Sequence, residues 1–232
     1  MRKKKDFWDA EYKSPGHLAL STEPSEDLEK FTRYLVREYG KKFLNVTTLV
    51  ADLGCGNGRN LIYLAKKFGI HGVGYDTSKE ALMQGRAATA AQELPLIFEE
   101  RSIAKPIPLG DESVLIALDM MSSHVLLRSE REALRAEILR VLKPEGWLFF
   151  KSFLLDDDAH AKRLLRENPA QEEGMYIHPE IGTAEYVWTE EALRDFYEPY
   201  FTIHHLEKSF KHKHVDGSAW KRRTICAYLQ KA

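Results

Sequence analysis

A turn that contains Gly54, Gly56 and Gly58 is the part of this sequence best suited to bind a ligand. It follows an apolar run at residues 48–51 that ends in Asp52, and a segment able to start a helix comes next. Such apolar runs are typical of buried parallel strands. Glycines permit a sharp turn and close approach of a ligand, and a helix start directs free N–H groups into the turn. The pattern predicts a nucleotide-type pocket.

The spacing of these glycines indicates which nucleotide would bind. A dinucleotide fingerprint reads G-x-G-x-x-G, and its third glycine permits close packing of helix and strand. Arg59 stands where that pattern needs a small residue. An acid such as Asp52 is awkward beside a pyrophosphate but suits an ammonium group. S-adenosylmethionine has an amino-acid end with both charges and no phosphate, so it fits the pattern better than a dinucleotide does.

Residues 52–58, with the sequence DLGCGNG, resemble the first motif of the class I S-adenosylmethionine-dependent methyltransferases. The resemblance extends over residues 46–154 and includes a Leu-Lys-Pro-x-Gly turn at residues 142–146. It implies an α/β fold: a doubly wound, mostly parallel seven-stranded sheet with helices on both faces and an antiparallel hairpin at the C-terminal edge. Strands and helices alternate through residue 154, which is typical of a parallel sheet.

The resemblance also implies a set of cofactor-binding residues. Asp76 ends a second predicted strand at residues 71–76, where a carboxylate can accept hydrogen bonds from both ribose hydroxyls or, alternatively, cap a helix. After the third strand the family has an acid near the adenine, but this chain has Ser102 and Ile103 there. The expected set is Asp52, Gly54, Cys55, Gly56, Asn57, Asp76, Thr77, Ser102, Ile103, Asp119 and Met120.

Three other segments are expected to form the acceptor site. They are the loop after the fourth predicted strand, an aromatic N-terminal arm, and residues 155–199, an insert whose alternative role is a structural flap. His124, Asp119 and His178 are the candidate proton acceptors, although a thiolate nucleophile would need none. The residues expected to contact the acceptor are Trp8, Tyr12, His124, Tyr176, His178, Glu180, Tyr186 and Trp188.

The expected organisation is a single methyltransferase domain over residues 1–232. Residues 1–45 form an arm and a helix, predicted over residues 25–39, that cover the cofactor. Residues 46–154 form the cofactor-binding core, residues 155–199 the insert on the substrate side, and residues 200–232 the C-terminal hairpin. A hydrophobic content of 44% in 232 residues is enough for the core of one large α/β domain.

Composition limits the kinds of partner and compartment. A net charge of −1 gives no global field that would attract nucleic acid. A basic cluster at residues 208–223 could bind RNA phosphates, but we favour a protected strand edge. Two cysteines, no apolar run of membrane-spanning length and no signal segment predict a cytoplasmic protein without membrane contact. We expect no metal site.

The leading hypothesis is a methyltransferase with a small-molecule acceptor. The loop after the fourth strand lacks both the Asn-Pro-Pro-Tyr motif and a cysteine that could attack a cytosine ring. A tRNA or protein methyltransferase of the same fold is the first alternative. An oxidoreductase that uses NAD and a non-catalytic binding or scaffold module are the alternatives from other classes.

Overall fold

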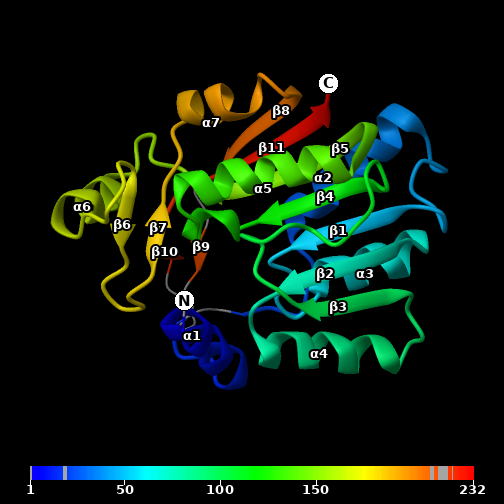
Figure 1. Ribbon diagram of the computed structural model, residues 1–232, viewed down its shortest axis with the longest axis horizontal. Coiled ribbons are helices and arrows are strands. Elements are labelled where there is room, and N and C mark those ends of the chain that lie inside the picture. The colour runs from blue at the N-terminus through cyan, green and yellow to red at the C-terminus, as the bar shows by residue number, and fades with distance from the viewer. Residues whose placement is uncertain (1, 18–19, 210–211, 214–218, 221) are drawn as a thin grey trace.

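The computed structural model describes residues 2–17, 20–209, 212–213, 219–220 and 222–232. Its main sheet consists of β1 (Leu49–Leu53), β2 (His71–Asp76), β3 (Leu96–Glu100), β4 (Val114–Met120), β5 (Leu142–Phe153), β8 (Phe201–Ser209) and β11 (Thr224–Lys231). They lie in the order β3-β2-β1-β4-β5-β11-β8 (Figure 1). The first five are parallel, and β11 runs antiparallel to β5 and β8. The predicted fold class is confirmed.

Helices cover both faces of this sheet, as the doubly wound prediction requires. The helices are α1 (Arg2–Lys13), α2 (Glu26–Tyr39), α3 (Arg59–Phe68), α4 (Lys79–Ala90), α5 (Arg128–Val141), α6 (Ala159–Glu167), α7 (Glu190–Tyr197) and the short 3₁₀ helix η1 (Ser123–Val125). Apolar side chains of α2, α3 and α4 share one core with the sheet, and those of α5 and α7 share the other. No helix in the described ranges is both long and apolar enough to cross a membrane.

The carboxyl ends of the parallel strands all point to one side of the molecule. In Figure 1 that side also carries α1 and a small antiparallel hairpin formed by β6 (Met175–Ile177) and β7 (Ala184–Tyr186). The N-terminal arm and the insert therefore lie at the sheet edge where α/β folds bind ligands.

Two segments form structure that the sequence did not indicate. Residues 2–13 are helical, whereas the helix that we predicted in the N-terminal arm covers only residues 25–39. The β6–β7 hairpin lies in the insert at residues 155–199, for which we predicted no strands. Its strands have only three residues each, which is too short to show an alternating pattern.

The described members of the basic cluster are paired with acids. Lys208 Nζ lies 2.8 Å from Glu190 Oε2, Arg222 Nη1 lies 3.2 Å from Glu185 Oε2, and Arg223 lies near Asp157. The side chains of Lys211, His212, Lys213, His214 and Lys221 lie outside the described residues, although His212 and Lys213 form the backbone of β9 (His212–Lys213), paired with β10 (Ala219–Trp220). The described cations are therefore already neutralised.

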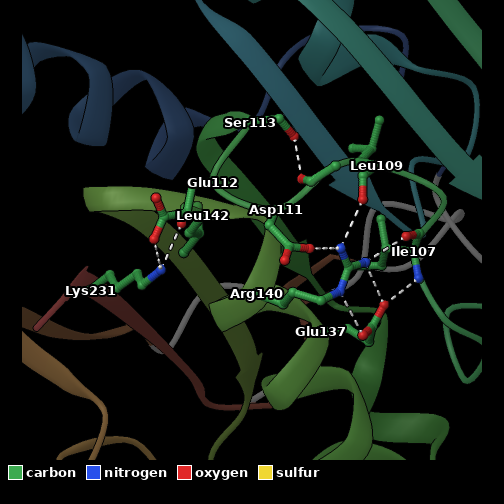
Figure 2. A network of polar contacts seen from close by, with 10 residues as sticks. Ile107, Leu109, Asp111, Glu112, Ser113, Glu137, Arg140, Leu142 and Lys231 are labelled. Atoms are coloured by element: carbon green, nitrogen blue, oxygen red, sulfur yellow. Dashed lines mark hydrogen bonds and ion pairs between the residues drawn. The ribbon is translucent and has the colours of Figure 1, made fainter.

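Arg140 of α5 fixes the long loop between β3 and β4 (Figure 2). Its guanidinium donates to the carbonyls of Ile107 (2.8 Å) and Leu109 (2.9 Å) and pairs with Asp111 (2.7 Å). Glu137 binds the same guanidinium and accepts the N–H of Ile107 at 2.7 Å. These bonds hold the loop that begins at Ser102, which is the expected adenine wall.

Phe31 anchors α2 to the sheet, and its removal should therefore destabilise the fold. The side chain is fully buried and stacks on Phe149, with ring centroids 5.0 Å apart. We expect Phe31→Ala to lower the free energy of unfolding by about 3–5 kcal/mol because it leaves a cavity. Urea unfolding measures this change. Val46→Ala, at a side chain that is 65% exposed, is the control and should change stability little. A loss below about 1 kcal/mol for Phe31→Ala would show that α2 is not held by this packing.

Candidate active site

A cavity of about 800 Å³ opens at the carboxyl ends of the parallel strands. It extends from the glycine turn to the loop after β4 and to the β6–β7 hairpin. A volume of this size is ample for a nucleotide-sized ligand together with a small molecule. The predicted site residues on its wall are Trp8, Tyr12, Gly54, Cys55, Gly56, Asn57, Asp76, Thr77, Ser102, Ile103, Met120, His124, His178 and Glu180.

The glycine turn has no space for side chains at two positions. Gly54 has φ +82°, and a Cβ there would lie 2.3 Å from the Cβ of Ser122. Gly56 has φ +54°, and its Cβ would lie 2.1 Å from the hydroxyl of Tyr12. Both φ values favour glycine. Any side chain at these two positions would therefore displace Ser122 or Tyr12, which line the same cavity.

Asp76 joins the end of β2 to this turn. Its carboxylate accepts the N–H of Gly56 at 2.8 Å and the N–H of Ser78 at 2.8 Å. Burial raises the pKa of Asp76, although these N–H bonds oppose the rise. The N–H of Thr77 also bonds this carboxylate, and since a carboxylate has about four acceptor sites, it keeps capacity for a ligand hydroxyl. The helix-capping alternative is also realised in part through Ser78, the N-cap residue of α4.

Asp52 and Asp119 lie behind the cavity wall, not on it. Both side chains are fully buried, and their Oδ2 atoms have no hydrogen-bond partner among the described residues. Burial and the charge of Asp76 raise the pKa of Asp52 to about 7. These carboxylates, each one residue before the end of its strand, point into the protein interior and do not line the cavity as we had expected. Their unsatisfied oxygens still favour a nearby cation.

The role of Asp119 in the structure is to shape the loop after β4. Its Oδ1 accepts the hydroxyl of Ser122 at 2.6 Å and the N–H of Ser123 at 3.1 Å. Ser122 also donates to the carbonyl of Leu53 at the end of β1. These contacts place η1, and with it His124, beside the glycine turn. Asp119 is a positioning group here and does not reach the acceptor space.

The N-terminal arm covers the glycine turn. In α1, Asp9 accepts the hydroxyl of Ser78 at 2.7 Å, and the carbonyl of Tyr12 accepts the side-chain amide of Gln84 at 2.7 Å. Further along the arm, the carbonyls of Ser21 and Glu23 accept the side chains of Asn57 and Arg59.

The acceptor end of the cavity contains two residues that the sequence analysis did not select, Glu185 and Arg222. Glu185 accepts the hydroxyl of Tyr176 at 2.5 Å and lies 4.0 Å from His124. The sequence showed Arg222 only as one member of a basic cluster. Its pairing with Glu185 depends on the hairpin and β11 lying side by side, which no local pattern indicates.

Three aromatic residues expected at the acceptor lie in the core instead. Glu185 of β7 faces the cavity, so the adjacent Tyr186 points to the opposite face of the strand. There its ring packs under Arg131, and Trp188 packs against Phe150. Tyr176 is fully buried, and only its hydroxyl reaches the site, through Glu185.

Cys55 lines the cavity but is not suited to attack a substrate. Its thiol is buried, and burial together with the charges of Asp52 and Asp76 raises its pKa well above the usual value. A thiol of this kind is a small apolar filler. Within the described residues there is also no group of three side chains that could hold a metal ion.

The sheet has the Rossmann-like doubly wound order, and the turn after its first strand lacks the dinucleotide pattern G-x-G-x-x-G. Comparison with known proteins identifies the class. Residues 50–146 match the family model described as a methyltransferase domain. A glycine/sarcosine/dimethylglycine N-methyltransferase from Actinopolyspora halophila is 29% identical over 152 residues, which are 64% of this chain and 26% of that protein.

Solved structures share the fold. An S-adenosylmethionine-dependent methyltransferase from Methanosarcina mazei has a TM-score of 0.69 at 23% identity, with 85% of this chain and 96% of that chain covered. A 1,6-didemethyltoxoflavin N1-methyltransferase from Burkholderia thailandensis, solved with S-adenosylhomocysteine, has a TM-score of 0.64 at 14% identity, with 89% and 79% covered. The chain spans 26–45% of the length of the curated relatives that it matches.

Residues 50–146 are similar to a methyltransferase domain, and the chain shares the fold of solved proteins that use S-adenosylmethionine as cofactor. The residues present fit this cofactor. Gly54, Gly56 and Asp76 line the cavity, and Asp76 retains acceptor capacity for ribose hydroxyls. Behind this wall, the Oδ2 atoms of Asp52 and Asp119 have no hydrogen-bond partner among the described residues, which favours a cationic group nearby.

The raised pKa of Asp52 predicts how stability depends on pH. The pKa of Asp52 is ordinarily 3.8 and is about 7 in the folded protein. At pH values between these two, the folded state keeps a proton that the unfolded state has lost. Stability from this group therefore falls as pH rises from 4 to 7. We expect Asp52→Asn to gain about 2 kcal/mol relative to the native protein between pH 5 and pH 8, measured by urea unfolding. The exposed Asp195→Asn should show no such gain, and equal curves for both variants would exclude a buried charge at Asp52.

Proposed function

We propose that this chain transfers a methyl group from S-adenosylmethionine to a small-molecule acceptor and leaves S-adenosylhomocysteine. The observation that carries the proposal is the single continuous wall from the glycine turn and Asp76 to His124 and His178. Cofactor and acceptor would therefore meet in one space. Residues 1–45 and 155–199 serve one domain in this proposal, as the cover and as the acceptor wall.

Each part of the wall has a role in this proposal. The glycine turn and Asp76 hold the amino-acid end and the ribose of the cofactor, and Ser102 and Ile103 lie at its adenine. When bound, S-adenosylmethionine supplies a methyl group on a positively charged sulfur, which keeps the C–S electron pair when the acceptor's lone pair takes the methyl carbon. The protein must align the acceptor and, where the nucleophile is protic, accept its proton. His124 and His178, which both line the cavity, are the candidates for that proton.

Three observations favour a small acceptor over tRNA or protein. Residues of the arm and of the hairpin line the cavity, and the described members of the basic cluster at residues 208–223 are paired with acids. Two of the similar proteins are also named for small acceptors, namely glycine derivatives and 1,6-didemethyltoxoflavin.

The rival classes fit the same residues less well. A dinucleotide-binding turn would need a small residue at position 59, so that the helix can pack closely on the strand. Arg59 begins α3 there instead, and its side chain donates to the carbonyl of Glu23 at 3.0 Å. A scaffold module would not need these three features on one cavity wall: a glycine turn with no space for side chains, an Asp76 carboxylate with free acceptor capacity, and a histidine.

Asp76→Ala tests the cofactor site. We expect the variant to bind S-adenosylmethionine more than tenfold more weakly, a loss of about 1.4 kcal/mol, because the ribose hydroxyls lose their acceptor. Equilibrium dialysis with labelled cofactor measures the affinity, and Asp195→Ala on the exposed side of α7 is the matched control. An unchanged affinity in folded Asp76→Ala protein would refute the assignment.

The acceptor class is tested by turnover. We expect the native protein to form S-adenosylhomocysteine only when a suitable amine, phenol or thiol is added from a panel of small molecules, and Asp76→Ala to form far less. Cofactor binding without turnover on any member of such a panel, but with turnover on bulk tRNA or on a protein extract, would replace the small-molecule proposal with one of those two classes.

A further inference from the structure

The N-terminal arm carries a histidine and a carboxylate that form a hydrogen-bonded pair at the cavity. Nδ1 of His17 lies 2.6 Å from Oε1 of Glu11, a side chain of α1. Glu11 is only 3% exposed, whereas His17 lines the cavity and its side chain is 46% exposed. Burying a carboxylate is costly unless donors compensate it, so the pair requires a physical explanation.

The turn that follows α1 holds Glu11 in its ionised form. The two oxygens accept the backbone N–H groups of Gly16 and His17 at 3.1–3.3 Å, in addition to the imidazole. Such N–H bonds favour the charged form of a carboxylate. Since an ionised carboxylate can only accept, Nδ1 of His17 carries the proton, and the lone pair of the neutral ring lies on Nε2. Among the described residues Nε2 has no hydrogen-bond partner.

The two sequence-predicted histidines of the cavity offer a lone pair less readily. Nδ1 of His178 accepts the N–H of Glu180 at 3.3 Å, which places the proton of the neutral ring on Nε2 and makes that atom a donor. Burial lowers the pKa of His178 and so keeps its ring neutral. His124 is 4% exposed, its Nδ1 is fully buried, and its Nε2 lies 4.0 Å from Glu185. Of these three cavity histidines, His17 has the most accessible accepting nitrogen.

The contacts of the arm bring His17 to the acceptor end of the cavity. The carbonyl of Tyr12 accepts the side-chain amide of Gln84 in α4, and the Tyr12 hydroxyl lies against Gly56. His17 follows on the same arm, close enough to His178 beside the hairpin for their charges to interact. The arm therefore covers the cofactor turn and carries an imidazole to the acceptor wall.

We propose that Nε2 of His17 takes the proton of the acceptor and that Glu11 is the positioning residue that holds its ring, so that the site serves an acceptor with an O–H or N–H group. The inference rests on the proposed methyltransferase function and narrows its acceptor class. A thiolate acceptor would make no use of the pair.

The step balances for such an acceptor. Its O–H or N–H bond breaks, the proton goes to Nε2 of His17, and the electron pair left behind bonds the methyl carbon while the sulfur keeps the C–S pair. The Glu11 carboxylate stabilises the imidazolium that forms. Because His17 is also exposed to solvent, it can then give the proton to water, which a fully buried histidine could not do directly.

Replacement of His17 tests the catalytic role on whichever acceptor the native protein methylates. We expect His17→Ala to lower kcat about 100-fold or more, because a positioned base is lost, and to leave the affinity for S-adenosylhomocysteine unchanged. Added imidazole should restore part of the lost rate. His71→Ala, at an exposed histidine outside the cavity wall, is the matched control and should change neither kcat nor the response to imidazole.

The tautomer of His17 tests the role of Glu11 without any acceptor. Long-range ¹H–¹⁵N spectra of the neutral imidazole, assigned by the signal missing from His17→Ala, should show the proton on Nδ1 in the native chain. We expect Glu11→Gln to lower kcat at least about tenfold at unchanged cofactor affinity, whereas the exposed Glu191→Gln should not. A native proton mainly on Nε2 would overturn the assignment of Glu11.

The failure of this inference differs from the failure of the proposed function. An unchanged kcat in folded His17→Ala protein, or turnover of thiols alone, would overturn the role of His17 and leave the methyltransferase activity standing. No turnover of any acceptor and no binding of S-adenosylhomocysteine by the native protein would refute the proposed function, and the role of His17 with it.

Discussion

The hydrogen bond from the N–H of Gly56 to the carboxylate of Asp76 is the contact on which the rest of the site depends. It ties the turn after β1 to the end of β2 at 2.8 Å, and it forms only because Gly56 adopts a positive φ under the hydroxyl of Tyr12. The turn, the ribose acceptor and the covering arm are therefore fixed together. A side chain at position 56 would displace the arm and the turn at once.

Buried carboxylates are the second constraint. Asp52, Asp119 and Glu185 all lie within or behind one cavity, where charge is expensive to maintain. Only Glu185 has a buried cation beside it, and its pKa is lowered, whereas burial raises the pKa values of the other two. The unpartnered oxygens of Asp52 and Asp119 are thus the feature that favours a cationic cofactor, whereas Glu185 is already balanced by Arg222.

The cofactor half of the site could be predicted from sequence because its signals are local. The apolar run, the glycines and the acid at residue 76 all lie within 30 residues, and each glycine reports a backbone position that no other residue fits. The acceptor half could not be predicted in the same way. Glu185 and Arg222 are 37 residues apart and meet only through the hairpin and β11. Tyr186 and Trp188 misled the prediction because aromatic residues in a loop-like stretch suit a core as well as a pocket.

Calorimetric titration of the native protein with S-adenosylhomocysteine and, separately, with NAD tests the central claim most directly. The account predicts micromolar binding of S-adenosylhomocysteine and no binding of NAD, since the turn after β1 lacks a pyrophosphate site. Binding of NAD, or no binding of the adenosyl compound to folded protein, would contradict it.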